Sequence, residues 1–183
     1  MTVPPWRTRS SRTIYQNPWL RLREDLVELP NGRTTVYGVV STGACVGVLP
    51  FLDPDTVVLV RQYRYVAGRH TWEMPTGGVG PGEPITDAAQ RELAEESGYR
   101  AGRLEPVCAY HTSKSVLDET AHLFLGFDLT RVGDTPEPDA TESFQVRPHG
   151  FEEVLGMVDS GEIVDSMTII AMLQAQRRRY QRV

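Results

Sequence analysis

The sequence predicts an α/β or α+β layered sandwich, because groups of strand-like segments alternate with helical segments along the chain. Apolar runs broken by turn signals fill the part before residue 80, a capped helical segment follows, and strands and then helices come again after it. Hydrophobic residues make up 40% of the 183 residues and charged residues 23%, which is ordinary for a globular protein. A chain of this length buries about 70% of its unfolded surface, so its core needs neither a disulfide nor a structural metal.

The first part of the chain predicts a hairpin and two further strands. The hairpin covers residues 20–40, and its turn is the Pro-Asn-Gly-Arg sequence at 30–33, followed by an arm at 34–40. Two more apolar runs, at 44–51 and 56–60, are separated by an Asp-Pro-Asp turn. The sheet is therefore expected to begin with these strands.

The first helix is predicted over residues 86–97. Thr86 or Asp87 can cap its N-terminus, and Gly98 can end it in the left-handed conformation. The remaining elements are predicted from the same signals. They are strands near 105–110, 122–127 and 143–146, a loop at 135–139, and helices at about 150–159 and 165–180.

Charge and cysteine usage exclude several classes of protein. With 24 acidic and 19 basic residues the formal net charge is −5, so nucleic acid and anionic lipid are not expected partners. Short basic clusters at 7–12 and 177–179 are expected to be solvated, mobile ends. Cys45 and Cys108 lie in apolar sequence without metal or redox spacing, which favours small buried residues. The absence of a signal peptide or a membrane span in the sequence predicts a cytoplasmic protein.

Three carboxylates crowd one face of the predicted helix. Glu92 and Glu96 differ by about 40° of rotation, and Glu95 lies about 60° to their other side. Like charges at these spacings destabilise a bare helix, so a compensating cation is expected. A hard cation such as Mg²⁺ or Mn²⁺ suits oxygen ligands, and the planar fork of Arg91 can clamp one carboxylate.

A glycine-rich loop at residues 77–82 comes just before this helix. Its backbone can approach a ligand closely, and its N–H groups can hold phosphate oxygens. The loop, the acidic helix and a metal together suit a diphosphate. The alternative is a solvated acidic helix face after a flexible loop, because charge runs usually have that role.

Residues 77–99 resemble the Nudix box at every position. The box reads Gly-x5-Glu-x7-Arg-Glu-U-x-Glu-Glu-x-Gly-U, where U is a bulky apolar residue, and a chance match is on the order of one in a million. Tyr99 is an aromatic residue where Ile, Leu or Val is more usual. The matching residues are Gly77, Glu83, Arg91, Glu92, Leu93, Glu95, Glu96, Gly98 and Tyr99.

Segments outside the box are similar to the ADP-ribose pyrophosphatase branch of this superfamily. These segments are residues 59–64 and 72–77, residues 17–19 and 23–25 near the start, and 161–165 with Thr168 near the end. The chain departs from the branch at residues 113–115, which read Ser-Lys-Ser. Members of the branch often have Ser-Pro-Gly there, a marker of preference for ADP-ribose.

The resemblance implies a Nudix-type α/β/α sandwich with a mixed sheet over residues 43–183. An N-terminal tail and an antiparallel β-hairpin region over residues 1–42 precede it. In this branch the N-terminal strands form a small sheet exchanged between subunits. A homodimer is therefore the implied oligomeric state.

The resemblance also implies residues for the metal and for the reaction. Water attacks a phosphorus atom, and Mg²⁺, or Mn²⁺ in its place, lowers the pKa of that water. The implied metal ligands are Glu92, Glu96, Glu95 and the carbonyl of Thr76. Arg91 is implied to orient carboxylates, and Glu83 to support the loop. The general base is expected to be Glu119, with Glu142 and Glu95 as alternatives, although each can also be a surface carboxylate.

Residues for substrate binding are implied in the same way. Trp19 is expected to stack on the base or else to lie in the core, and Lys114 to contact a phosphate or else to be merely exposed. The other implied residues are Arg64, which reaches phosphates, Glu73, which borders the site, and Gly77 and Gly78 of the loop.

The function expected first is the hydrolysis of ADP-ribose to AMP and ribose 5-phosphate. A second hypothesis keeps this chemistry but takes another nucleoside diphosphate sugar, such as GDP-mannose or UDP-glucose. A third is a non-catalytic nucleotide-binding regulator, which the complete set of box glutamates disfavours. A mutator-type nucleoside triphosphate hydrolase is disfavoured by the long N-terminal hairpin region.

Overall fold

The computed structural model describes residues 5–132 and 145–180, and the chain divides into two compact units. Unit 1 takes in residues 1–44 and 110–120, and unit 2 takes in residues 45–109 and 121–183.

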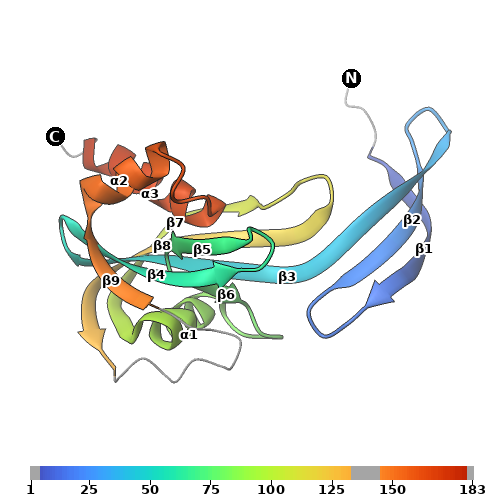
Figure 1. Ribbon diagram of the computed structural model, residues 1–183. Coiled ribbons are helices and arrows are strands. Elements are labelled where there is room, and N and C mark those ends of the chain that lie inside the picture. Colours follow the sequence, from blue (N-terminus) through green and yellow to red (C-terminus); the bar gives the residue numbers. More distant parts are fainter. Residues whose placement is uncertain (1–4, 133–144, 181–183) are drawn as a thin grey trace. The chain divides into compact units, whose positions relative to one another are not determined.

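Unit 1 is built on an antiparallel sheet of β1 (Arg7–Gln16), β2 (Arg21–Glu28) and the first part of β3 (Thr34–Asp53). β2 pairs with β3 from Arg21 opposite Ser41 to Glu28 opposite Thr34 (Figure 1). The hairpin predicted over residues 20–40 is therefore confirmed. The predicted break between strands at 34–40 and 44–51 is wrong, because β3 is continuous from Thr34 to Asp53.

The basic segment at residues 7–12 forms most of β1 and is not a mobile end. Every residue of β1 is exposed, so the strand has no apolar face that a sequence pattern could reveal. Its arginines instead meet carboxylates of β2. Arg12 Nε donates to Glu24 Oε1 at 2.8 Å, and Arg9 pairs with Glu28. Opposite charges across an antiparallel pair stabilise it, and neither strand shows this pairing when its sequence is considered alone.

Unit 2 has strands between helical layers, and the predicted α/β class is confirmed. Figure 1 shows α1 (Ile85–Ser97) on one side of the strands, and α2 (Phe151–Asp159) and α3 (Ser166–Tyr180) on the other. The second part of β3 pairs with β4 and β6, β4 also pairs with β5 and β9, and β7 pairs with β8. These strands are β4 (Thr56–Arg64), β5 (Arg69–Glu73), β6 (Thr76–Gly78), β7 (Tyr99–His111), β8 (Leu117–Arg131) and β9 (Gln145–Gly150).

The predicted helices lie within one residue of their observed positions. α1 begins after Pro84, whose φ of −62° suits a helix start, so neither Thr86 nor Asp87 is its cap. Gly98, at φ 72°, ends the helix as expected, and its N–H donates to Ala94 O. The strands predicted at 105–110 and 122–127 are parts of β7 and β8. The loop predicted at 135–139 and the start of the strand predicted at 143–146 lie outside the described residues.

Packing fixes α1 on the sheet of unit 2. Ala88, Ala89 and Leu93 are fully buried in one cluster with Val46 and Val48 of β3. With this apolar side of α1 packed on the sheet, the acidic residues of the helix lie toward β6, which α1 also contacts. The candidate site therefore forms where β6 leads into α1.

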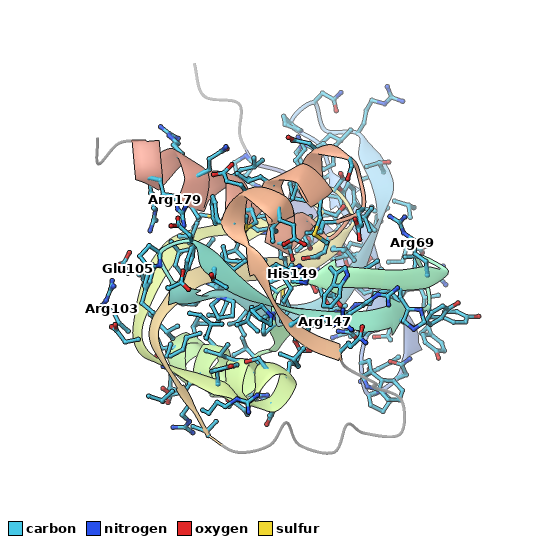
Figure 2. The ribbon with its side chains drawn as sticks, turned by 60° about the vertical axis from the view of Figure 1, so that its left-hand side comes forward. Arg69, Arg103, Glu105, Arg147, His149 and Arg179 are labelled. Carbon is cyan, nitrogen blue, oxygen red and sulfur yellow. The ribbon has the colours of Figure 1, made fainter. Side chains whose placement is uncertain are left out.

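The arginines at 177–179 end α3 and are not a mobile end, which corrects the second expectation about basic clusters. Arg178 Nη2 donates to Pro106 O at 2.8 Å. Arg179, which Figure 2 labels, has its guanidinium 3.7 Å from the centre of the Phe151 ring. Cations at a helix C-terminus are also favoured by the helix dipole. Cys45 and Cys108 are half-buried rather than fully buried, as their apolar sequence had favoured, and they form no disulfide. None of the helices in the described residues is long and apolar enough to cross a membrane.

Candidate active site

Gly77 lies in β6 directly against the side chain of Glu92 on α1. A Cβ atom at position 77 would collide with the Glu92 carboxylate, so only glycine leaves that carboxylate where it is. β6 is held by pairing with β3, with Gly77 opposite Val46. The pairing of β6 with β3 therefore holds the Gly77 backbone against the Glu92 carboxylate.

Arg91 joins the loop to the acidic helix. Its Nε and Nη2 donate to the two oxygens of Glu83, each at 2.9 Å, and Nη2 also donates to Gly78 O at 2.9 Å. Its Nη1 donates to Glu92 Oε1 at 2.7 Å and to Glu95 Oε2 at 3.1 Å. One guanidinium therefore fixes three carboxylates and one carbonyl, a geometry that an ammonium group does not reproduce.

Glu83 closes the loop before α1. Its Oε2 accepts the N–H of Gly80 at 2.8 Å as well as the guanidinium of Arg91. These hydrogen bonds lower the pKa of Glu83 to about 2, with the bond from Arg91 as the largest cause. The carboxylate therefore stays ionised wherever the protein is folded and the pH is near neutral.

Replacing Glu83 by glutamine is expected to reduce the loss of unfolding free energy that occurs as the pH falls from 6 to 3. Because the pKa of Glu83 is lower in the folded state than in the unfolded state, its contribution is complete above a pH of about 4.3 and is lost as the pH falls toward 2. Urea unfolding at pH 6 and at pH 3 measures this. Wild type should lose more stability between the two pH values than Glu83→Gln, and equal losses would contradict the assignment.

Glu96 is the buried carboxylate of the site. Only 8% of its surface is exposed, and its Oε2 accepts the N–H of Thr76 at 2.9 Å. Burial raises its pKa to about 8, the hydrogen bond from Thr76 opposes this shift, and the nearby charges of Glu92 and Glu73 add to it. The folded chain without a cation thus holds a proton on Glu96 at neutral pH.

A second ion pair borders the site on β4 and β5. Arg64 Nε donates to both oxygens of Glu73, at 2.9 and 3.1 Å. The Glu73 side chain is 3% exposed and that of Arg64 is 43% exposed. Burial raises the pKa of Glu73 despite the opposing effect of Arg64. The pair keeps the partly exposed guanidinium in one orientation, with its other N–H groups left to bind an anion.

The donor set on α1 fits a hard divalent cation. In residues 5–132 and 145–180, no group of three or more acidic, histidine or cysteine side chains is already arranged around a metal position. Arg91 holds Glu92 and Glu95, and the Thr76 N–H holds Glu96. Carboxylate oxygens are nevertheless the ligands that such a cation prefers, and a cation would relieve the repulsion that raises the pKa of Glu96.

The segment that leads into β6 is fixed by a contact that sequence reasoning missed. Thr168 Oγ1 accepts the buried N–H of Met74 at 2.9 Å and donates to Asp165 Oδ2 at 2.6 Å. These residues of α3 and of the segment before it come from a part of the chain more than ninety residues away from Met74. Residues 161–165 and Thr168 were noted only for their similarity to the ADP-ribose pyrophosphatase branch, and their sequence did not show that Thr168 and Asp165 hold this backbone.

The structure brings together all the predicted site residues of unit 2, from Arg64 to Glu96. Trp19, Lys114 and Glu119 belong to unit 1, and Glu142 lies outside the described residues. Trp19 is 79% exposed, so the alternative that places it in the core is wrong. The Glu119 carboxylate accepts hydrogen bonds from the hydroxyls of Thr42 at 2.8 Å and Thr112 at 2.5 Å.

A glycine-rich loop, an acidic helix and an arginine clamp thus meet in unit 2 of an α/β sandwich. The NUDIX domain family model matches residues 41–166, and the chain belongs to the Nudix family. A second family model, the nucleoside diphosphate sugar hydrolase N-terminal domain, matches residues 6–40. The two matches meet between residues 40 and 41, close to the predicted start of the Nudix domain at residue 43.

Similar proteins are found over nearly the whole chain. It is 32% identical to the ADP-ribose pyrophosphatase of Bacillus subtilis over 170 residues, which cover 93% of this chain and 92% of that protein. It is 30% identical to the methanol dehydrogenase activator of Bacillus methanolicus, with the same coverage of 93% and 92%. The crystal structure of an ADP compounds hydrolase has a TM-score of 0.85 at 20% identity and covers 100% of this chain and 98% of its own, which shows the fold.

Proposed function

We propose that this protein is a Mg²⁺-dependent pyrophosphohydrolase that cleaves ADP-ribose to AMP and ribose 5-phosphate. Membership of the Nudix family and the relative named ADP-ribose pyrophosphatase support hydrolysis of a sugar nucleotide. The observation that carries the proposal is the complete set of box carboxylates gathered by Arg91 beside the buried Glu96.

The residues of unit 2 have separate tasks in this proposal. Glu92, Glu95, Glu96 and the carbonyl of Thr76 would hold the cation, while Arg91 orients the carboxylates. A bound divalent cation lowers the pKa of the attacking water and neutralises charge on the diphosphate. The oxygen-only donor set favours Mg²⁺, with Mn²⁺ as a substitute.

Substrate phosphates would meet cationic and backbone donors of the same unit. Arg64 presents a guanidinium already oriented by Glu73, and the glycines at 77 and 78 allow the diphosphate to approach the backbone. Trp19, exposed in the turn between β1 and β2, offers a flat surface for the base.

Glu119→Gln is expected to lower kcat about a hundredfold with little change in KM, because a general base acts mainly in the transition state. Glu142→Gln is the matched variant in the same assay, since it makes the same chemical change at the competing position. We expect its kcat to stay within a factor of a few of wild type. A large loss in Glu142→Gln alone would move the base to Glu142, and no loss in either variant would move it to Glu95.

We further propose that the chain forms a homodimer through unit 1. This unit exposes large apolar side chains, including Trp6 at 53%, Tyr15 at 56% and Val36 at 60%. Apolar surface that a monomer leaves open is typical of an interface between proteins. Light scattering after gel filtration measures the mass directly, and 20.5 kDa would contradict the dimer.

A further inference from the structure

Unit 1 contains a polar hollow of about 230 Å³ between β3 and the turn that joins β7 to β8. Arg23, His111 and Lys114 line it, together with Tyr37 and Asp118. At about 30 Å³ for each water molecule, the hollow has room for several waters or for a phosphate group. Among the lining residues, Arg23 and Lys114 are cations and Asp118 is a carboxylate, so positive side chains outnumber negative ones.

The two cations at the hollow differ in their partners. Arg23 is neutralised, because its Nε donates to the buried Asp25 at 3.1 Å and its Nη1 lies 3.6 Å from Asp118. The side chains of Lys114 and His111 make no hydrogen bond or ion pair with any other described residue. The ammonium group of Lys114 is thus left without a carboxylate, although Asp118 lines the same hollow.

Lys114 is the only lysine among the 183 residues, because the other 18 basic residues are arginine. A lysine differs from arginine in presenting a compact charge with three rotatable donors, which suits a small anion. The chain thus has its one compact cation at this hollow. A reagent specific for amines can therefore modify only one side chain, that of Lys114.

The turn that carries Lys114 is anchored rather than loose. Tyr37 donates its hydroxyl hydrogen to Ser115 O at 2.7 Å, and Val40 N–H donates to Val116 O at 2.9 Å. Within the turn, Leu117 N–H donates to Ser113 O at 3.0 Å. The hollow is therefore formed before any ligand enters, which reduces the entropy cost of binding.

We propose that this hollow binds a phosphate-sized anion, with Lys114 as the charged residue and His111 as a further donor. The phosphate can belong to a nucleotide substrate or can be a free ion. The first of these sources rests on the proposed function, whereas the site itself does not.

Pyridoxal 5′-phosphate tests the site in the native protein without a substitution. Its aldehyde condenses with the Lys114 amine, water leaves, and borohydride reduces the resulting C=N bond to a stable amine. Peptide mapping measures labelling at Lys114 relative to labelling at the N-terminal amine in the same sample. Because a bound phosphate group concentrates the reagent at the hollow, this ratio should be about tenfold higher than with pyridoxal, which lacks the phosphate. Inorganic phosphate should lower the ratio by a similar factor. Equal ratios for the two reagents, or no protection by phosphate, would overturn the proposal.

Calorimetric titration with inorganic phosphate gives a second measurement that does not depend on turnover. Lys114→Gln should weaken phosphate binding about tenfold, because a charge-assisted hydrogen bond is lost. Arg33→Gln is the matched control, since it removes one positive charge from an exposed turn of the same unit. Equal weakening in both variants would show a general charge effect and would overturn the site.

An ADP-ribose analogue with a methylene bridge in its diphosphate distinguishes the two sources of the anion. Protection of Lys114 by the analogue assigns the hollow to the substrate, whereas protection by inorganic phosphate alone assigns it to a free anion. Failure of both to protect contradicts the site. If phosphate protects but no sugar nucleotide is hydrolysed, the proposed function fails and the anion site stands.

Discussion

Glu96→Gln is expected to lower kcat at saturating Mg²⁺ by about a hundredfold or more and, without metal, to make the protein more stable at pH 8. The activity falls because the amide is a poor ligand for a hard cation. The stability rises because the neutral amide still accepts the N–H of Thr76 but avoids the cost of a buried charge. Steady-state kinetics and urea unfolding in EDTA measure the two effects.

The raised pKa of Glu96 determines how the stability of the metal-free protein changes with pH. Since burial raises the pKa of Glu96 to about 8 from an ordinary value of 4.5, the folded state binds more protons than the unfolded state between these values. Stability from this group is complete below about pH 4.5 and is lost as the pH rises through 8. Wild type should therefore lose stability from pH 5 to pH 8 by more than Glu96→Gln does.

Asp87→Asn is the control for both effects. Asp87 is an exposed carboxylate in the first turn of the same helix, so its loss costs only the helix-dipole term, on the order of 0.3–1 kcal/mol. Its kcat should remain near that of wild type. If Glu96→Gln retains turnover within a factor of a few of wild type, Glu96 is not a metal ligand.

Gly77→Ala is expected to lower kcat about a hundredfold with a change of less than about 1 kcal/mol in the free energy of unfolding. The new Cβ would collide with the end of the flexible Glu92 side chain. That side chain can move aside at small cost to folding, but the displaced carboxylate no longer lies where the site needs it. Kinetics and urea unfolding of the same preparation test both halves of the prediction.

Gly156→Ala is the matched control for this substitution. A Cβ atom there would have nothing within 4 Å, and Gly156 lies inside α2. Alanine should stabilise the helix by about 0.5–1 kcal/mol and leave kcat unchanged. Full activity in Gly77→Ala would contradict the role of the Gly77 and Glu92 contact.

The candidate site was predictable to the extent that it is local in sequence. Glu92, Glu95 and Glu96 share one helix, so their spacing alone placed them on one face, and Arg91 lies beside them in the chain. The fork of Arg91 predicted a clamp on a carboxylate, and the structure adds that it also reaches Glu83 and Gly78 across the loop.

The rest depended on contacts between elements that no local pattern shows. β1 has no apolar face and forms through charges opposite it on β2, so its sequence resembled a mobile basic end. The pKa of Glu96 is raised mainly by burial, which no spacing reveals. The contact of Thr168 with Met74 likewise joins α3 to the segment between β5 and β6, 94 residues away in sequence. Such features follow from tertiary packing rather than from local pattern.

The most direct test of the proposed function is product analysis with ADP-ribose and Mg²⁺, with and without EDTA. UDP-glucose, GDP-mannose and nucleoside triphosphates would be assayed beside it. We expect AMP and ribose 5-phosphate in equal amounts from ADP-ribose, with loss of both products in EDTA. Binding of nucleotide without hydrolysis of any sugar nucleotide would contradict an enzymatic function and leave a nucleotide-binding protein.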